Sequence, residues 1–345
     1  MGFKNLSIFN SSTHVGTSDA RAICLRFSLF IGVFAAIFAA FSFHFAAITT
    51  KNRLIYRKPF KAFVDSNPLV LFVGDSHPGM DIDPVALNGT FFSLAEGGTN
   101  LRQILLRIDF AVRKKPSIRF VVIPLDYHIF ATPRYINKWF ADDLYYTDNM
   151  SLIMELYDVS VLEYFKQRMA HHLPLTSGNN WEKYGLVVIG MLERTLFHHP
   201  RKMGAGNRAS NLVVDLPIWS TLSERQRYSR AKRRVASHFD PSIVVPEMVC
   251  IFDRLLNYCR THGLATIGVM YPITEDYIRA AAGYDLDKVS RIYEERRNQF
   301  LFILDYRQFY LDKPQLFLNS DHLSVEGVRV FTERIQEDIE RKLFK

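Results

Sequence analysis

The sequence predicts an α/β domain, a three-layer sandwich with a mostly parallel sheet, preceded by one transmembrane helix and interrupted by a helical insertion. Short, continuous apolar runs alternate with amphipathic stretches, which is typical of buried parallel strands connected by helices. One uncharged apolar run near the amino terminus is long enough to cross a bilayer. The 345 residues are 48% hydrophobic and 23% charged, which excludes a disordered chain.

The predicted transmembrane helix covers residues 27–48, a run of 22 residues without a charge. Such a helix spans roughly 30 Å of hydrocarbon. The run is longer than the apolar core of a signal peptide, about 7–15 residues, and it follows a polar leader over residues 1–26. We therefore expect an uncleaved single-pass anchor, followed by a juxtamembrane linker over residues 49–65. Lys and Arg are more frequent in this linker, which favours a cytoplasmic location for the carboxy-terminal side.

The α/β domain is expected over residues 66–345. Helical spacing of apolar side chains predicts helices over residues 101–112, 246–262 and 325–343. Residues 134–245 break the alternation, contain all three tryptophans, and are expected to form a mostly helical insertion. Five apolar runs predict the strands, at residues 69–73, 91–94, 119–123, 264–270 and 300–304.

The net charge of +8 is concentrated in residues 201–234, which hold nine basic and two acidic side chains. No helix-turn-helix, zinc-finger or RNP-type pattern accompanies them, which disfavours a nucleic-acid partner. We expect a solvated helix face, or a face turned to an anionic polysaccharide or lipid head groups near Arg225–Arg234. Three cysteines cannot form a disulfide scaffold, and no Cys/His grouping has zinc spacing, so we expect no metal and no other cofactor.

The segment Gly74-Asp75-Ser76-His77 directly follows the first predicted strand. Active sites of parallel α/β sheets lie beyond the carboxyl ends of the strands. A serine at this position could attack an ester carbonyl if a base accepts its proton. On its own, the segment also fits an ordinary turn after a strand.

The segment Asn319-Ser320-Asp321-His322 precedes the last predicted helix. His322 is a candidate base, and Asn319 or Asp321 could orient its second ring nitrogen. The alternative is a surface loop that ends at a helix N-cap. Because a doubly wound sheet can bring both segments to one rim, the two together favour a Ser–His pair.

A Gly-rich turn, residues 94–100, lies between the second predicted strand and the next helix. Backbone N–H groups at such a turn are well suited to bind an oxyanion. The same residues would serve equally as a tight turn with a helix N-cap. Asp81 and Asp83 are interpreted as loop and cap residues.

These three segments resemble the conserved blocks of the SGNH (GDSL-type) hydrolase superfamily, over residues 66–130 and 246–345. The resemblance implies that Ser76 is the nucleophile, that His322 is the base, and that the N–H groups of Ser76 and Gly98 bind the oxyanion. A membrane helix before such a domain is similar to the envelope polysaccharide O-acetylation proteins. This implies an O-acetyltransferase or acetylesterase outside the cytoplasm, in the periplasm or at the cell surface, with a multi-span membrane acyltransferase as acyl donor.

Two positions depart from the family pattern. Asn319 occupies the position of the usual acid, three residues before the His, and the usual Gly-x-Asn-Asp block is replaced by residues 124–128. Asp75, His77, Asp126 and His128 are candidates to line the site. The departures favour an alternative function, a non-catalytic membrane-anchored interaction protein with a degenerate SGNH fold.

Overall fold

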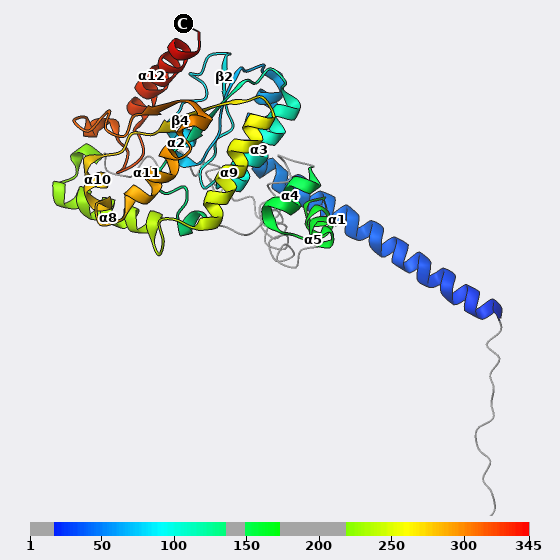
Figure 1. The fold of residues 1–345 in the computed structure, drawn as a ribbon. Coiled ribbons are helices and arrows are strands. Elements are labelled where there is room, and N and C mark those ends of the chain that lie inside the picture. Colours follow the sequence, from blue (N-terminus) through cyan, green and yellow to red (C-terminus); the bar gives the residue numbers. More distant parts are fainter. Residues whose placement is uncertain (1–16, 136–148, 173–218, 345) are drawn as a thin grey trace, which may run out of the picture. The chain divides into compact units, whose positions relative to one another are not determined.

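The structure is a computed structural model that describes residues 17–135, 149–172 and 219–344, without the side chains of residues 17–20, 45–61 and 170–172 (Figure 1). The polar leader up to residue 16, Trp139 and Trp181 lie outside the described residues. The chain divides into two compact units, Met1–Asn52 with Met169–His198, and Arg53–Arg168 with His199–Lys345. The sheet and the candidate site both belong to the second unit.

The second unit is built on a five-stranded sheet in which every strand pair is parallel. The strand order is β2-β1-β3-β4-β5. The strands are β1 (Val70–Phe72), β2 (Phe91–Ser93), β3 (Phe120–Pro124), β4 (Ala265–Met270) and β5 (Phe300–Asp305). Each strand lies within a residue or two of its predicted position, and the predicted α/β class is confirmed.

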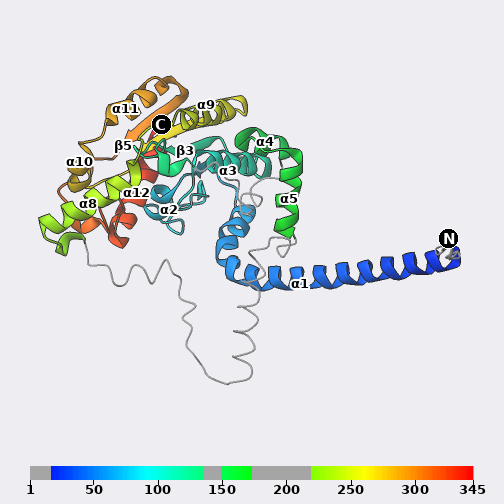
Figure 2. The ribbon, with the colours of Figure 1, turned by 90° about the horizontal axis from the view of Figure 1, so that it is seen from below.

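Successive side chains of the central strands enter two different cores, as the strand period of two requires. Leu71 and Val121 pack with α3 (Leu101–Lys114), α9 (Pro246–Thr261) and α11 (Leu286–Glu294). Val70, Phe72 and Val122 pack with α12 (Val325–Leu343) on the opposite face. The sheet is therefore covered by helices on both faces, and the three-layer sandwich is confirmed (Figures 1 and 2).

The described part of the predicted insertion contains helical segments. They are η1 (Thr132–Arg134), α4 (Met150–Tyr157), α5 (Val161–His172), η4 (Trp219–Thr221) and α8 (Glu224–Phe239). Helix α8 packs against α10 (Glu275–Ala281) and η1, which places it beside the α/β domain. The elements η5 (Arg297–Gln299) and η6 (Pro314–Leu316) precede β5 and α12.

The amino-terminal helix α1 (Thr17–Asp65) continues without a break through the predicted linker. Within it, Arg21–His44 is 24 residues long and has a mean hydropathy of 2.2, and its large apolar side chains are exposed. In the described part of the chain it is the one helix that is long and apolar enough to span a membrane, and a signal sequence near the amino terminus would fit the same criteria. At the other end of α1, Phe63 is fully buried in the core of the α/β domain.

The turn after β1 positions the candidate nucleophile. Gly74 has φ +144°, and a Cβ there would lie 2.5 Å from Pro78 Cγ and 2.7 Å from Pro124 Cγ. Only glycine fits this position. The chain then enters the five-residue helix α2 (Ser76–Met80), where the side chain of Asp75 accepts a hydrogen bond from the N–H of His77.

Candidate active site

Ser76 lies at the carboxyl end of β1 as the first residue of α2, and it is half-buried. Asp75 accepts a hydrogen bond from the N–H of His77 at 3.2 Å, which fixes the start of the helix. Among the described residues, the Ser76 hydroxyl has no hydrogen-bond partner. It is therefore free to contact a substrate or a base.

Three backbone N–H groups in the β1–α2 turn and the glycine turn donate no hydrogen bond within the described part of the chain. They belong to Ser76, Gly97 and Gly98. The Glu96 N–H donates to the Gly74 carbonyl at 3.1 Å and thereby holds the glycine turn against the β1–α2 turn. A Cβ on Gly97 would lie 3.9 Å from Ser76 Cβ, whereas no atom lies within 4 Å of one on Gly98, the predicted donor. The structure thus brings Gly97 directly beside Ser76.

His322 is buried at the same rim of the sheet, only 2% exposed. Its ring packs edge-on against the ring of His77, with centroids 5.0 Å apart. The segments that contain Ser76 and His322, 246 positions apart in the chain, therefore come into contact, and the contact is made by His77, the residue next to Ser76. No hydrogen bond joins Ser76 to His322 among the described residues, and the His322 Nε2 atom lies 3.0 Å from Arg234 Nη2.

Asn319 and Asp321, the residues predicted to orient the imidazole, contact other groups. The Asn319 side-chain oxygen accepts hydrogen bonds from the N–H groups of Asp321 and His322, both at 2.9 Å, so it holds the backbone of the loop. The Asp321 carboxylate accepts from Arg234 Nε at 3.0 Å and lies 3.8 Å from His322 Nε2. Burial alone would raise the pKa of Asp321, but the positive charges around it, among them Arg234 and His77, hold it well below its usual range.

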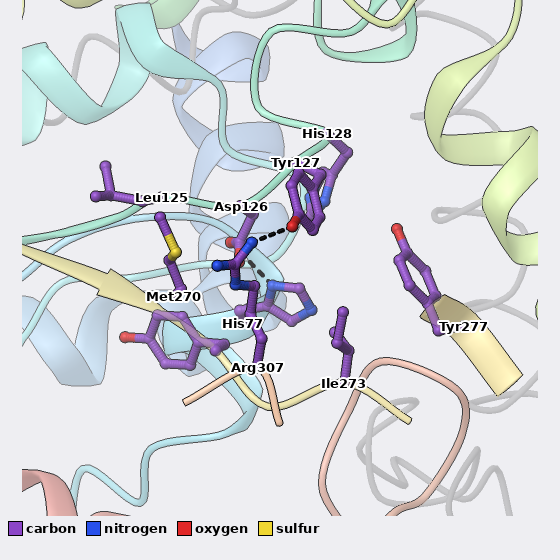
Figure 3. Close-up of a pocket in the computed structure, with 10 residues that line it drawn as sticks. His77, Leu125, Asp126, Tyr127, His128, Met270, Ile273, Tyr277 and Arg307 are labelled. Carbon is purple, nitrogen blue, oxygen red and sulfur yellow. Dashed lines mark hydrogen bonds and ion pairs between the residues drawn. The ribbon is translucent and has the colours of Figure 1, made fainter. Parts of the chain in front are cut away.

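His77 forms the centre of a buried polar cluster. Its Nδ1 lies 2.9 Å from Asp126 Oδ2 (Figure 3). Its Nε2 lies 3.8 Å from Asp321 Oδ2. Burial alone would lower the pKa of His77, but the carboxylates of Asp126, Asp81 and Asp75 raise it to about 10. His77 is therefore an imidazolium at neutral pH, and it cannot act as a base there.

A second part of the cluster surrounds Asp75. His128 Nε2 and Arg134 Nη2 lie 2.8 Å and 2.7 Å from Asp75 Oδ2. Burial would raise the pKa of Asp75, but these two partners hold it well below its usual range. Burial lowers the pKa of His128, and that of His238, whose ring stacks on His128 with centroids 4.4 Å apart. Both of these imidazoles are neutral at pH 7.

A small pocket opens at the carboxyl ends of β3 and β4, next to this cluster (Figure 3). His77, Asp126 and His128 line it, together with Tyr127, Tyr277 and Arg307. Three of the four predicted lining residues therefore lie in one pocket wall. The fourth, Asp75, reaches the pocket through its hydrogen bond to His128.

Two groups of side chains offer metal-ligand atoms within 4.8 Å of one another. In the first, which is Asp75, His77, Asp126 and His128, the guanidinium of Arg134 already balances the carboxylate of Asp75. The second, which is His77, Asp81 and His322, would need a lone pair on His77, whose raised pKa of about 10 keeps that imidazole protonated at neutral pH. We assign no metal to either group.

Sequence reasoning missed Arg134, Arg234 and His238, and it interpreted Asp81 as a cap. Asp81 is indeed the C-cap of α2, but its carboxylate also lies 3.6 Å from His322 Nδ1. Arg234 and His238 are four residues apart, so they share one face of α8. That spacing was the available signal that part of the basic helix faces inward.

Comparison with known proteins gives limited information about this chain. No family model matches it, and no curated protein matches it. Among solved structures, it is similar to a Bacteroides fragilis protein assigned as an acylhydrolase, with 11% identity, 79% of this chain and 87% of that chain covered, and a TM-score of 0.36. It is also similar to a GDSL-like lipase from Bacteroides thetaiotaomicron, with 11% identity, 88% and 100% covered, and a TM-score of 0.36. Likenesses this distant carry no weight for the activity, so the site is interpreted from its own geometry.

Proposed function

We propose that the chain is a serine acyl-ester enzyme in which Ser76 is the nucleophile and His322 is the base. One observation supports this above the others. Ser76 presents a hydroxyl and an N–H group without hydrogen-bond partners in the described chain, and it lies beside Gly97, whose N–H, like that of Gly98, donates no hydrogen bond there. A nucleophile next to preorganised N–H donors is the arrangement that acyl transfer requires.

The reaction is a double displacement. Ser76 Oγ attacks the ester carbonyl carbon while its proton moves to His322 Nε2, and the N–H groups of Ser76 and the Gly97-Gly98 turn bind the oxyanion. The C–O bond to the leaving alcohol then breaks, and the alcohol takes the proton from Nε2. An acceptor hydroxyl next gives its proton to Nε2 and attacks the acyl-serine. Collapse of the second oxyanion returns the proton to Ser76.

The acceptor that we propose is a hydroxyl group of an anionic envelope polysaccharide, with acetyl as the transferred group. The apolar segment Arg21–His44 supports an anchor at the membrane. In this proposal the domain lies outside the cytoplasm, and a multi-span membrane acyltransferase is the acyl donor. Four cations of α8 make no ion pair in the described chain and could bind a polyanion: Arg225, Arg230, Lys232 and Arg233. Transfer to water instead would make the protein an acetylesterase.

The activity is tested with the full chain in detergent, a chromogenic acetyl ester and a serine-directed phosphonate. Ser76→Ala should lower turnover by roughly 10³-fold or more and abolish labelling. Ser117→Ala is the matched control. Ser117 lies just before β3, at the amino end of that strand and away from the site, and its hydroxyl donates a hydrogen bond to the Pro68 carbonyl. Equal turnover by wild type and Ser76→Ala would refute a serine mechanism.

The acceptor is tested by adding an acidic polysaccharide to the acetylated enzyme. Transfer predicts an acetylated sugar, detected by mass spectrometry, and faster loss of the acyl-enzyme than in buffer alone. Free acetate as the sole product would instead assign the protein as an acetylesterase.

One observation favours the alternative of a non-catalytic interaction protein, because Arg234 rather than Ser76 contacts His322 Nε2. This alternative predicts that the wild-type chain neither reacts with the phosphonate nor turns over acetyl esters. Labelling of Ser76, identified by peptide mass spectrometry, would exclude it.

A further inference from the structure

The surroundings of His322 define which ring nitrogen carries its proton. Arg234 Nη2 lies 3.0 Å from Nε2, and a guanidinium can only donate hydrogen bonds. Nε2 must therefore accept, so the neutral imidazole carries its proton on Nδ1. This is the tautomer that leaves a lone pair on Nε2 for the proton of a nucleophile.

The Nδ1 atom of His322 has no hydrogen-bond partner among the described residues, and the carboxylate that faces it is Asp81, with Oδ1 3.6 Å away. Asp321 lies nearer to the other nitrogen and is held by Arg234. Asn319 accepts hydrogen bonds from the loop backbone. Asp81 is thus the one described acid placed to interact with the Nδ1 proton.

Asp81 is also held in place from two sides. Its backbone N–H donates to the His77 carbonyl at 2.7 Å and ends α2, and its Oδ1 accepts from the N–H of Leu323, the residue after His322, at 2.9 Å. The side chain is fully buried, and Oδ2 has no partner in the described chain. The His77 imidazolium offsets part of the cost of burying this carboxylate, and a positive charge that forms on His322 would offset more of it.

We infer that Asp81 is the positioning residue of His322, and that it replaces the acid missing at Asn319. This inference rests on the proposed serine mechanism. Ser76 and Asp81 then lie at the two ends of the same helix, so α2 supplies both the nucleophile and the partner of its base. The contact between His322 Nδ1 and Asp81 shortens to a hydrogen bond when His322 takes the serine proton. Catalytic hydrogen bonds often shorten in this way when the free enzyme binds its substrate.

Asp81 has two tasks in this arrangement. It keeps the Nδ1–H tautomer in place, and its charge stabilises the imidazolium that forms as Ser76 attacks. The other charged or titratable groups around the ring are Asp321 and Arg234 at Nε2 and the cation His77 against its edge. Arg234 must give up its contact with Nε2 when the serine binds there.

The substitution Asp81→Asn separates charge from shape. The amide oxygen can still accept the Leu323 N–H, so the loop keeps its anchor, but the negative charge is lost. We expect kcat on a chromogenic acetyl ester to fall by about 10- to 1000-fold, the effect of removing an opposite charge within a few ångströms, while KM stays within about twofold. The melting temperature identifies any loss of folding.

Asp83→Asn is the matched control, since Asp83 is two residues away and accepts a hydrogen bond from the Val85 N–H instead of facing the imidazole. It should leave kcat unchanged. An unchanged kcat in Asp81→Asn, with Ser76→Ala inactive, would overturn the inference and leave the proposed function standing. A wild-type chain without turnover or labelling would instead overturn the proposed function.

A second measurement does not depend on the folding of the Asp81 variant. The proton NMR spectrum of the wild-type chain should contain a downfield imidazole N–H signal that His322→Gln removes, because an Nδ1–H that faces a carboxylate is protected and deshielded. Absence of such a signal would contradict the inference. So would activity that is lost with EDTA and restored by a divalent ion, since Asp81 would then be a metal ligand.

Discussion

At the level of single residues, the charge of His77 determines how the polar cluster responds to pH. Its folded-state pKa of about 10 lies above the value of about 6.5 expected for an unfolded chain. Its contribution to stability is therefore complete below about pH 6.5, and it is lost as the pH rises toward 10. The physical cause is the set of buried carboxylates around the ring, of which Asp126 is the strongest.

We expect His77→Gln to flatten the pH dependence of the free energy of unfolding between neutral pH and pH 10, because the variant cannot lose that proton. At pH 7 the variant should be less stable than the wild type, since Asp126 loses its buried cationic partner. Urea unfolding of the full chain at several pH values measures both effects.

The exposed His262 provides the control for this series, and His262→Gln should leave the curve of the wild type unchanged. A wild-type stability that stays constant from pH 7 to pH 10 would contradict the assignment of a buried imidazolium.

At the level of elements, the position of α12 controls the loop that carries His322. Ser324 caps α12 directly after this loop, and Gly327 lies in its first turn. A Cβ on Gly327 would lie 2.1 Å from the Leu316 carbonyl oxygen of η6, a backbone atom that cannot move independently. The close approach of these two backbones requires glycine.

Gly327→Ala should therefore lower the free energy of unfolding by about 1–3 kcal/mol, the usual cost of overpacking. It should also lower esterase turnover, because the shift of α12 reaches the His322 loop. Thermal unfolding and ester hydrolysis check the two effects. Gly283→Ala serves for comparison, because no atom lies within 4 Å of a Cβ there. Equal melting temperatures for the two variants would show that the contact is not tight.

The helices and strands were predictable from sequence where burial alone determines the pattern of apolar residues. The run at residues 69–73 is apolar throughout, because β1 is an interior strand buried on both faces. So short an apolar run fits a strand better than a helix. The turn after it was recognisable from Gly74. The boundary of α1 was not, because a helix through residues 49–65 depends on the packing of Phe63 in the core, which sequence periodicity does not reveal.

The site was predictable in part for a similar reason. Ser76 follows the end of a strand and His322 precedes the last helix. In a parallel α/β sheet, the topology alone places both positions at the carboxyl ends of the strands. Arg234 was expected on a solvated face, because the sequence of α8 does not show that Asp321 lies buried opposite it. The expected partner of His322 was Asn319, at the family spacing, or the adjacent Asp321, whereas the carboxylate that lies 3.6 Å from His322 Nδ1 is that of Asp81, from a distant segment of the chain.

At the level of the whole molecule, the segment Arg21–His44 has the length and composition of a membrane span or of a signal sequence. Large apolar side chains are exposed along it, and they need a lipid or protein environment. The proposed anchor predicts that the mature chain, analysed by mass spectrometry, retains this segment and stays in the membrane fraction after high-salt washing. A mature chain that begins after His44 would identify a signal sequence instead.

The orientation of the anchor is a separate prediction. The proposed function places the domain outside the cytoplasm, opposite to the positive-inside count over residues 49–65. A reporter that is active only outside the cytoplasm, fused to the carboxy terminus, should therefore give a signal. A signal from a cytoplasm-specific reporter would refute an envelope substrate.

The polar cluster draws its members from four stretches of chain, around residues 75–81, 126–134, 234–238 and 321–322. During translation, Ser76 is synthesised 246 residues before His322. Nascent polypeptides would consequently stay chemically silent during synthesis, and a reactive serine would emerge only once the closing helix has docked.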